Sequence, residues 1–491
     1  MTYKMKTPVL DMHLTKLLAT GLCAIATAIS GFAQPAGMLS DTSALANARI
    51  LPFHATPQDL RNGNAHSRFG IFGIDSIPNF NGQFFADGVD PAGNPNRHWY
   101  TNTVGNPPQM GGTTVINAPI QAINVELDDA DGNLVFVNGH PLTLDATPFV
   151  TLVQNSPVFS NAMYSSSDTP TQFVDAVQRA EYFNQMKPNW HTLLAANPKP
   201  AATIHIRQPA TCPTGPNLAG CNYAFIPKSD GSCCATILVE DNVLLDALVN
   251  VLATDIDANL IATKDITTLI LPDVAAFFGD LAHCCIMGFH NYVFRSGTDP
   301  EMRWVFAAPS WISPDDAFAA HFFLQDIVGV SHEMTEIYND PFVGSDSDHN
   351  VTPWWLGPNG FCTDFLEAGD VLQVMPTSLV PISMNGFTYH PQNETLLQWF
   401  EFKSPSDALG GAYSYPNTAQ LTQLSPPQKP FCAQYLNFRP GYPVCAARFR
   451  CHGEPSGPDR LPRPRVRMSS YSARHTPIQP GWRRERNQAR R

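Results

Sequence analysis

The sequence predicts an α/β (α+β) fold in which helices cover a layered mixed sheet, preceded by a loop-rich N-terminal part. Two segments, 169–184 and 241–254, carry apolar residues at helical spacing and are predicted to be helices. Short apolar segments that are predicted to be strands occupy 202–206, 266–271, 292–294 and 304–307. Strands that alternate with helices along a chain are typical of layered folds.

The character of the sequence changes at three points. We expect four parts: a signal peptide at 1–33, a loop-rich segment at 34–110, the α/β domain at 111–447 and a disordered basic tail at 448–491. The second part is rich in Asn, Gly, Pro and Phe and has no helical period. The last part is dominated by Arg, Pro and Ser, which cannot build a core.

A hairpin is predicted near the start of the domain. Residues 123–127 and 134–137 read as strands, and the acidic segment between them contains Asp131-Gly132. An Asp-Gly pair between two such strands is a turn signal. A calcium-binding loop is the alternative for this segment.

The composition favours a rigid exported protein over a nucleic-acid-binding protein. Of the 491 residues, 43% are hydrophobic, which is enough for a sizeable core, and only 15% are charged, compared with a typical ~25%. The net charge of −12 divides into +9 for residues 448–491 and −21 for the rest of the chain. An acidic body repels phosphate, so we expect no nucleic-acid partner.

The N-terminus has the pattern of a secretory signal peptide. Lys4, Lys6 and Lys16 precede an apolar run at 17–29, and small residues before Gln34 predict cleavage after Ala33. The apolar run is shorter than the ~20 residues that a membrane span needs, and no later stretch is long and apolar enough. We therefore expect a secreted, periplasmic or extracellular protein with no membrane span after cleavage.

Ten cysteines follow the leader, and an even number in an exported chain predicts disulfides. Cys212 and Cys221 bracket a Pro/Gly loop and are placed to close it. The vicinal pairs at 233–234 and 284–285 offer a thiolate metal site as an alternative. The absence of any Cys-x-x-Cys spacing disfavours that alternative.

A long helix is predicted from residue 313 to about Tyr338. Ser313 stands at the cap position, Pro314 in the first turn, and two acidic residues follow at the positive end of the helix dipole. Apolar residues continue to Val330, so we expect the helix to be buried. Residues 339–341 (Asn-Asp-Pro) end it.

This predicted helix carries His332, Glu333 and Glu336 near its end. His332 and Glu336 are four residues apart and share a face, so that both can bind one metal ion. Glu333 is turned about 100° away, where it can act as a general base on a metal-bound water. Gly329, one turn earlier, leaves room beside the ion. The alternative is a His and two Glu that bridge a buried helix without any ion.

A third ligand is expected from beyond the helix. Glu367 and Asp370 lie about one turn of chain apart, and either would complete a three-ligand site. Asp346 and Asp348 lie in a polar loop and are weaker candidates, with simple solvation or calcium binding as the alternatives. His290 and His321 are candidates for supporting the ligands, although a single His among apolar residues is more often a satisfied core group.

The pattern Ser331-His332-Glu333-Met334-Thr335-Glu336, followed by residues 340–341 (Asp-Pro) and 366–370 (Leu-Glu-Ala-Gly-Asp), resembles a motif of the plant phosphate-induced, EXORDIUM-like family and of related secreted bacterial proteins. Residues 284–290 are similar to that family's Cys-Gly-x-His stretch. The resemblance covers about residues 260–400 and implies an extracellular, zincin-like domain. Glu336 replaces the second His of the zinc-peptidase motif His-Glu-x-x-His, which makes the site more anionic.

Two functions follow from these observations. The first is a secreted metal-dependent hydrolase, most simply a zinc metallopeptidase acting on a peptide or protein substrate, with Glu333 activating water. Its cofactor is one divalent ion, zinc or, because the ligand set is rich in oxygen, calcium. The second is a non-catalytic extracellular or cell-surface protein in which the same residues form a structural metal site.

Overall fold

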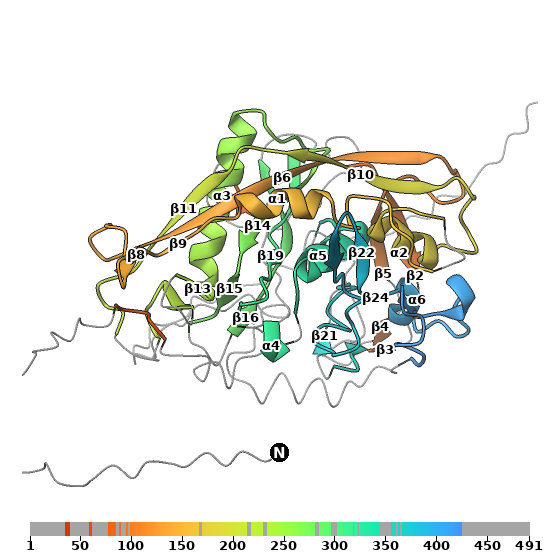
Figure 1. Cartoon of the computed structure of the whole chain (residues 1–491). Helices are drawn as coiled ribbons and strands as arrows, with labels where there is room; N and C mark the ends of the chain where they lie inside the picture. The colour runs from red at the N-terminus through yellow and green to blue at the C-terminus, as the bar shows by residue number, and fades with distance from the viewer. Residues whose placement is uncertain are drawn as a thin grey trace, which may run out of the picture.

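Helices and mixed sheets both build the chain, so the expected α+β class is confirmed by the computed structural model (Figure 1). The structure describes residues 35–39, 58–60, 77–84, 88–89, 95–96, 99–165, 169–213, 218–228, 233–279, 284–295, 302–317, 319–322, 324–342, 355–359, 362–363 and 366–424. The expected leader and basic tail lie outside these residues, as do Asp346 and Asp348.

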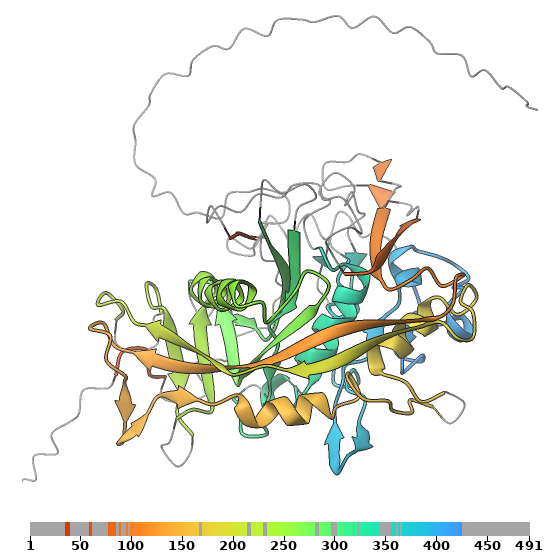
Figure 2. The ribbon, with the colours of Figure 1, turned by 90° about the horizontal axis from the view of Figure 1, so that it is seen from above.

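The longest strand, β6 (Thr113–Asp128), organises the main sheet. Alternate side chains from Ile116 to Ile120 enter one hydrophobic core, and those from Ile123 to Leu127 enter a second core. Because successive side chains of a strand point to opposite faces, β6 contributes to a core on each side of the sheet. Figure 2 shows the consequence, with α1 (Thr147–Gln154) on one side of β6 and α3 (Asp241–Asp257) on the other.

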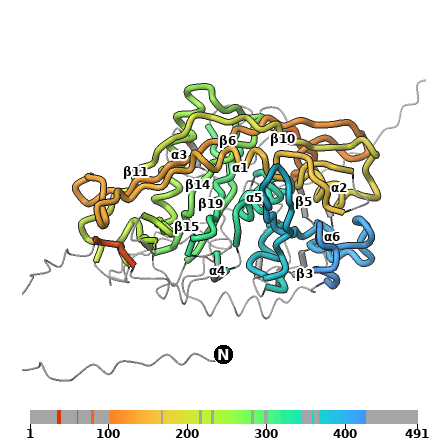
Figure 3. The backbone as a smooth tube through the Cα atoms, in the orientation of Figure 1, coloured from red at the N-terminus to blue at the C-terminus, as the bar shows by residue number. Residues whose placement is uncertain are grey.

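Both edges of β6 are paired. Along one edge, β10 (His191–Pro198) and then β11 (Ala202–Arg207) run parallel to it, and the two tubes lie side by side with it in Figure 3. Along the other edge it pairs with β14 (Ile266–Pro272) in parallel and with β9 (Thr143–Leu144) in antiparallel orientation. The sheet is therefore mixed, as expected.

Beyond β14 the main sheet continues toward the site. The further strands are β18 (Met302–Ala307), β17 (His290–Arg295), β1 (Gln58–Asp59) and, at the end of β14, β19 (Ser310–Trp311). The strands predicted at 202–206, 266–271, 292–294 and 304–307 are thus confirmed as β11, β14, β17 and β18. All seven residues of β14 are buried, which explains its continuous apolar sequence.

A second sheet adjoins the first through Asp273. Its four strands are β12 (Tyr223–Ile226), β13 (Thr236–Glu240), β15 (Val274–Phe277) and β16 (Cys284–Ile286). Asp273 follows β14 directly, has a positive φ of 47° and accepts a hydrogen bond from Ser313 N through Oδ1 at 2.6 Å. The chain passes at this residue from the main sheet to the second one.

The remaining described strands form short two-stranded ladders. These pair β2 (Asn79–Phe84) with β5 (Trp99–Val104), β3 (Gly88–Val89) with β4 (Pro95–Asn96), β7 (Phe136–Val137) with β8 (His140–Pro141), β20 (Trp355–Leu356) with β21 (Cys362–Thr363), β22 (Ile382–Met384) with β23 (Phe387–Tyr389), and β24 (Glu394–Thr395) with β25 (Ser414–Tyr415). The predicted acidic turn after β6 is confirmed. There, Asp129 Oδ1 accepts hydrogen bonds from the backbone of Asp131 and Asn133, both at 2.9 Å.

The predicted helices at 241–254 and 169–184 are α3 and α2 (Phe173–Glu181). The Glu240 side chain caps α3 by accepting from Asn242 N and Val243 N, and apolar residues at helical spacing bury one face of the helix. The other described helices are α4 (Ala319–Phe322), α5 (Val328–Asn339), α6 (Leu397–Phe400) and a 3₁₀ turn at Leu409–Gly411.

The single helix predicted from residue 313 to 338 is wrong in its first half. The chain forms the short α4, leaves helical geometry, and begins α5 only at Val328. The break lies at Asp326, which has a positive φ of 34° and pairs with Ile312 in an antiparallel bridge. Asp326 is held there by His390, whose Nδ1 lies 2.6 Å from Asp326 Oδ2. The predicted end of the helix at Asn339 is confirmed.

Three disulfides join cysteines of the described residues. The predicted Cys212–Cys221 bond is present and closes its loop. The vicinal pairs at 233–234 and 284–285 are also disulfide-bonded, so their sulfurs are not thiolates that could hold a metal. Within the part of the chain that the structure describes, no helix is long and apolar enough to cross a membrane.

Candidate metal centre

The centre is built on α5, which packs against β5, β17, β18, β19 and α2. Every residue of α5 is buried except His332, whose side chain is 12% exposed. Glu333 and Glu336 therefore lie inside the protein, where an ionised carboxylate needs a partner. The i, i+4 spacing holds His332 and Glu336 together as the sequence predicts, with His332 Nε2 at 3.1 Å from Glu336 Oε1.

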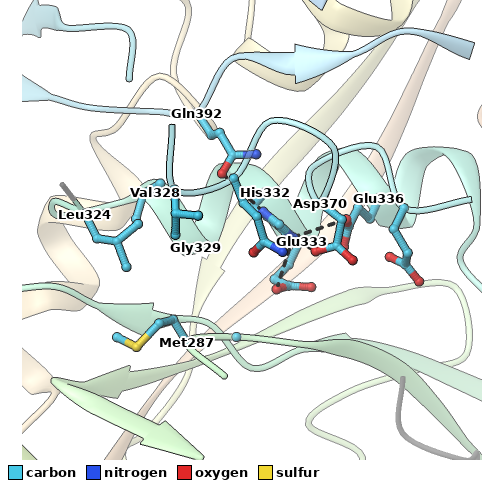
Figure 4. A pocket seen from close by; sticks show the side chains of 13 residues that line it. Met287, Leu324, Val328, Gly329, His332, Glu333, Glu336, Asp370 and Gln392 are labelled. Atoms are coloured by element: carbon cyan, nitrogen blue, oxygen red, sulfur yellow. Dashed lines mark hydrogen bonds and ion pairs between the residues drawn. The ribbon is translucent and has the colours of Figure 1, made fainter. Parts of the chain in front are cut away.

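Residues from three other segments converge on this helix. His290 opens β17, Glu367 and Asp370 lie on the loop that follows β21, and Glu394 opens β24. All four are buried. Figure 4 shows His332, Glu333 and Asp370 gathered at one end of a pocket, with Gln392 beside His332. Four of the eleven glutamates of the chain thus meet at one point.

Two carboxylates on α5 lie between the two imidazoles. Glu336 directs Oε1 to His332 Nε2 and Oε2 to His290 Nδ1, which is 3.4 Å away. Glu333 has the same relation but lies nearer to His290, with Oε2 at 3.2 Å from His290 Nδ1 and Oε1 at 4.0 Å from His332 Nε2. Each imidazole therefore faces both carboxylates.

The two candidates for a third ligand lie on different sides of Glu336. Asp370 Oδ1 is 3.6 Å from His332 Nε2, whereas Glu367 Oε2 is 3.9 Å from His290 Nδ1. Two sets of three residues, each with ligand atoms within 4.8 Å of one another, could hold a metal ion. One consists of His332, Glu333 and Glu336, and the other of His290, Glu336 and Glu367.

The hydrogen bonds behind the imidazoles define which nitrogen faces the carboxylates. His290 Nε2 lies 3.2 Å from the carbonyl oxygen of Asp340, and a carbonyl can only accept, so Nε2 carries a proton. His332 Nδ1 lies 3.3 Å from Gln392 Oε1 and donates to it. The amide is oriented by its Nε2, which donates to Gly369 O at 2.6 Å. In the neutral form, both histidines then direct a lone pair at the cluster, as metal-ligating histidines do.

The pKa values of the histidines and of Glu336 reflect mutual stabilisation. Burial lowers the pKa of His290, but hydrogen bonds with Glu333 and Glu336 outweigh this and raise it to about 10. Burial likewise opposes the charge on His332, yet Glu336 and its neighbours hold that pKa well above its ordinary value. Burial would raise the pKa of Glu336, but His332 and His290 hold it well below the usual range.

The other carboxyl groups lack such compensation. Burial raises the pKa of Glu333, although the hydrogen bond with His290 opposes the rise. Burial, followed by the charge of Glu336, raises the pKa of Glu367 and Asp370 well above the usual range, and burial does the same for Glu394. Among the described residues, Asp370 Oδ2 and Glu394 Oε1 have no hydrogen-bond partner. A bound cation would compensate this group of carboxylates, so the donor set fits a divalent metal ion.

Two glycines let the backbone pack closely against the side chains of the centre. A Cβ atom on Gly369 would lie 2.5 Å from Nδ1 of His332, so the glycine lets the loop lie against the imidazole ring. A Cβ atom on Gly288 would lie 2.9 Å from Glu333 Oε1. The pocket beside the carboxylates has an apolar end with Met287, Leu324 and Val328 (Figure 4). Gly329 also lines this pocket, in agreement with the space predicted there.

The sequence predicted only a supporting role for His290 and did not indicate Gln392 or Glu394 as residues of the centre. His290 was expected only as a supporting residue, but it faces three carboxylates directly. The rarity of Glu in the chain is the signal that could have drawn attention to Glu394. The side chain of His321 and the loop with Asp346 and Asp348 lie outside the described residues.

Comparison with known proteins adds no relative. No protein-family model matches the chain, and neither a curated protein nor a solved structure matches it. The class of protein therefore rests on the fold and on the site. They define an α+β protein with a buried cluster of histidines and carboxylates that could hold a metal ion.

Proposed function

We propose that the protein is an exported metal-dependent hydrolase, most simply a metallopeptidase, whose cation is held by His332, Glu336 and Asp370. The observation that carries the proposal is the position of Glu333. Its Oε1 lies 4.0 Å from His332 Nε2, and both residues line the pocket, so Glu333 would stand beside a cation held by the other three residues. A carboxylate beside three ligands and an open pocket is the arrangement of a general base at a catalytic metal.

The ligand atoms favour zinc over calcium. Calcium takes six to eight oxygen ligands, whereas an imidazole nitrogen suits zinc and other first-row metals. A divalent cation at this point supplies Lewis acidity, which polarises a carbonyl oxygen and makes water easier to deprotonate. Glu333 takes up the proton of the attacking water and passes it to the leaving amine. His290 orients Glu333 through the 3.2 Å contact between Nδ1 and Oε2.

Two further features support export and an extracellular setting. The first is the sequence pattern of the leader, and the second is the set of disulfides, which persist in oxidising compartments. The resemblance of residues 331–341 and 366–370 to the EXORDIUM-like family, with its zincin-like domain, favours the same location. The apolar end of the pocket suits a substrate side chain without charge.

A structural metal site in a non-catalytic extracellular protein is the second candidate. The observation that favours it is burial, because Glu333, Glu336, Glu367 and Asp370 are each at most 5% exposed. A structural site needs ligands but no base, so the two candidates differ in the role of Glu333.

The experiment compares the wild type and three variants on a broad peptide library, after metal analysis of each. For a hydrolase, Glu333→Gln keeps the ion and loses on the order of 10²- to 10⁴-fold in activity, because an amide cannot accept the proton. His332→Ala loses both the ion and stability. Glu126→Gln, a change at a partly exposed strand residue, serves as the control and keeps both properties. A wild-type protein that binds the ion without hydrolysing any peptide would support the structural site.

A further inference from the structure

We propose that the centre holds two divalent cations, with the second on the His290 side and Glu336 as the bridging ligand. The first cation is that of the proposed function, bound by His332, Glu336 and Asp370, and this inference rests on that proposal. The second would be bound by His290, Glu336 and Glu367. Each cation then has one imidazole nitrogen, one terminal carboxylate and one oxygen of the shared carboxylate.

The two oxygens of Glu336 carry the argument. Oε1 lies 3.1 Å from the inward nitrogen of His332, and Oε2 lies 3.4 Å from the inward nitrogen of His290. Glu336 thus offers one oxygen to each imidazole, and a carboxylate with this geometry can bridge two ions.

The His290 side is prepared for a ligand in the same way as the His332 side. His290 is 3% exposed, and its Nε2 donates to the carbonyl oxygen of Asp340, so Nδ1 is the nitrogen that faces the cluster. Nδ1 lies 3.2, 3.4 and 3.9 Å from carboxylate oxygens of Glu333, Glu336 and Glu367. A cation that displaces the proton of Nδ1 would have an imidazole nitrogen and carboxylate oxygens around it at this point.

The number of buried carboxyl groups also suffices for two divalent ions. Five carboxyl groups converge, from Glu333, Glu336, Glu367, Asp370 and Glu394, and each residue is at most 5% exposed. Once cations displace the bound protons, one divalent ion offsets two of these carboxylates and two ions offset four. Among the described residues, Asp370 Oδ2 lacks any hydrogen-bond partner, which leaves it available on the His332 side.

The chemistry of the donors identifies the cation class. A mixed nitrogen and carboxylate set suits first-row divalent ions such as Zn²⁺ or Mn²⁺. Paired ions in hydrolytic centres lie ~3.5–4 Å apart and hold both the attacking and the leaving oxygen or nitrogen. Glu333 does not belong to the second set of ligands and remains the base.

The test is a titration of metal-free protein with Mn²⁺, with bound metal measured by atomic emission and by electron paramagnetic resonance. We expect two Mn²⁺ per chain and a spin-coupled spectrum in the wild type. Glu367→Gln should bind one Mn²⁺, with an uncoupled six-line spectrum. Glu181→Gln removes an equally buried carboxyl that lies outside the cluster, where it accepts from Asn339 Nδ2, and this variant should still bind two.

Each outcome is decisive, and the wild-type result does not depend on whether a variant folds. One uncoupled Mn²⁺ in the wild type would overturn the second cation while the proposed function stands. Two Mn²⁺ in Glu367→Gln would place the second ion elsewhere and also overturn the inference. No bound Mn²⁺ or Zn²⁺ in the wild type would overturn the proposed function as well.

Discussion

Gln392 holds the imidazole of His332 from behind, with Oε1 at 3.3 Å from Nδ1. Two further hydrogen bonds fix Gln392. Its backbone N donates to Ser331 Oγ at 2.8 Å, and its side-chain Nε2 donates to Gly369 O. The ligand on α5 is thus oriented by a residue 60 positions later in the chain. Such outer contacts set both the tautomer and the basicity of a metal-bound histidine.

Gln392→Leu should therefore weaken metal binding without removing a ligand. We expect the dissociation constant for Zn²⁺ to rise roughly 10- to 100-fold, measured by competition with a chromogenic chelator. Gln121→Leu is the control, since Gln121 is also buried, lies on β6 and donates to Pro200 O rather than to a residue of the centre. It should lower stability and leave the dissociation constant unchanged. Equal affinity in the two variants would contradict a positioning role for Gln392.

Gly369→Ala tests the close approach of the loop to His332. The added methyl would lie 2.5 to 2.7 Å from three atoms of the imidazole ring, so the ring must move. We expect a loss of Zn²⁺ affinity and a lower melting temperature of the metal-loaded protein. Gly329→Ala is the control on α5, because its methyl would meet other atoms only at 3.4 Å or more. Should Gly369→Ala bind Zn²⁺ as tightly as the control, the loop would not set the position of the ring.

The sequence predicts best those elements in which the spacing of apolar residues within the element indicates which side chains are buried. The apolar run of β14 and the helical spacing in α3 depend on neighbours within the element. The strand β6 shows the limit. Only its end was predicted, at 123–127, whereas the strand begins at Thr113 because β10 pairs with its first half.

The same distinction applies to the site. The spacing of His332 and Glu336 is a property of one helix, so the sequence predicts that they meet. His290 and Gln392 reach the cluster from segments far along the chain, through the order of the strands and the path of the C-terminal part. The break at Asp326 has the same origin, because His390 holds it from 64 residues away.

Glu181 supplies a prediction on stability and pH that does not involve the metal. It is fully buried, and burial raises its pKa to about 8, although Asn339 and Leu397 N both donate to Oε1. The folded protein keeps this carboxyl protonated above pH 4.5, where the unfolded chain loses the proton. Stability is therefore lost as pH rises from about 4.5 to 8, at ~1.4 kcal/mol per pH unit.

Glu181→Gln removes this dependence and retains the acceptor oxygen. We expect the variant to be more stable than the wild type at pH 8, on the order of several kcal/mol, and equally stable at pH 4.5. Thermal unfolding of metal-free protein at both pH values measures the difference. A variant that is less stable at pH 8 would show that Glu181 is ionised and paired in the folded protein.

Metal binding should release protons and weaken as pH falls. In the metal-free protein, the pKa of His290 is raised to about 10, since hydrogen bonds with Glu333 and Glu336 outweigh burial. Burial, followed by the charge of Glu336, also raises the pKa of Glu367 and Asp370. With a pKa of about 10, His290 holds its proton at pH 7, so a cation bound to Nδ1 must displace that proton. We expect at least one proton to be released per cation, and the dissociation constant to rise roughly tenfold per unit fall in pH for each proton released.

Isothermal titration of Zn²⁺ in buffers with different ionisation enthalpies counts the protons. Equal binding enthalpies in Tris and in phosphate would mean that no proton leaves, and that the cation binds outside this cluster.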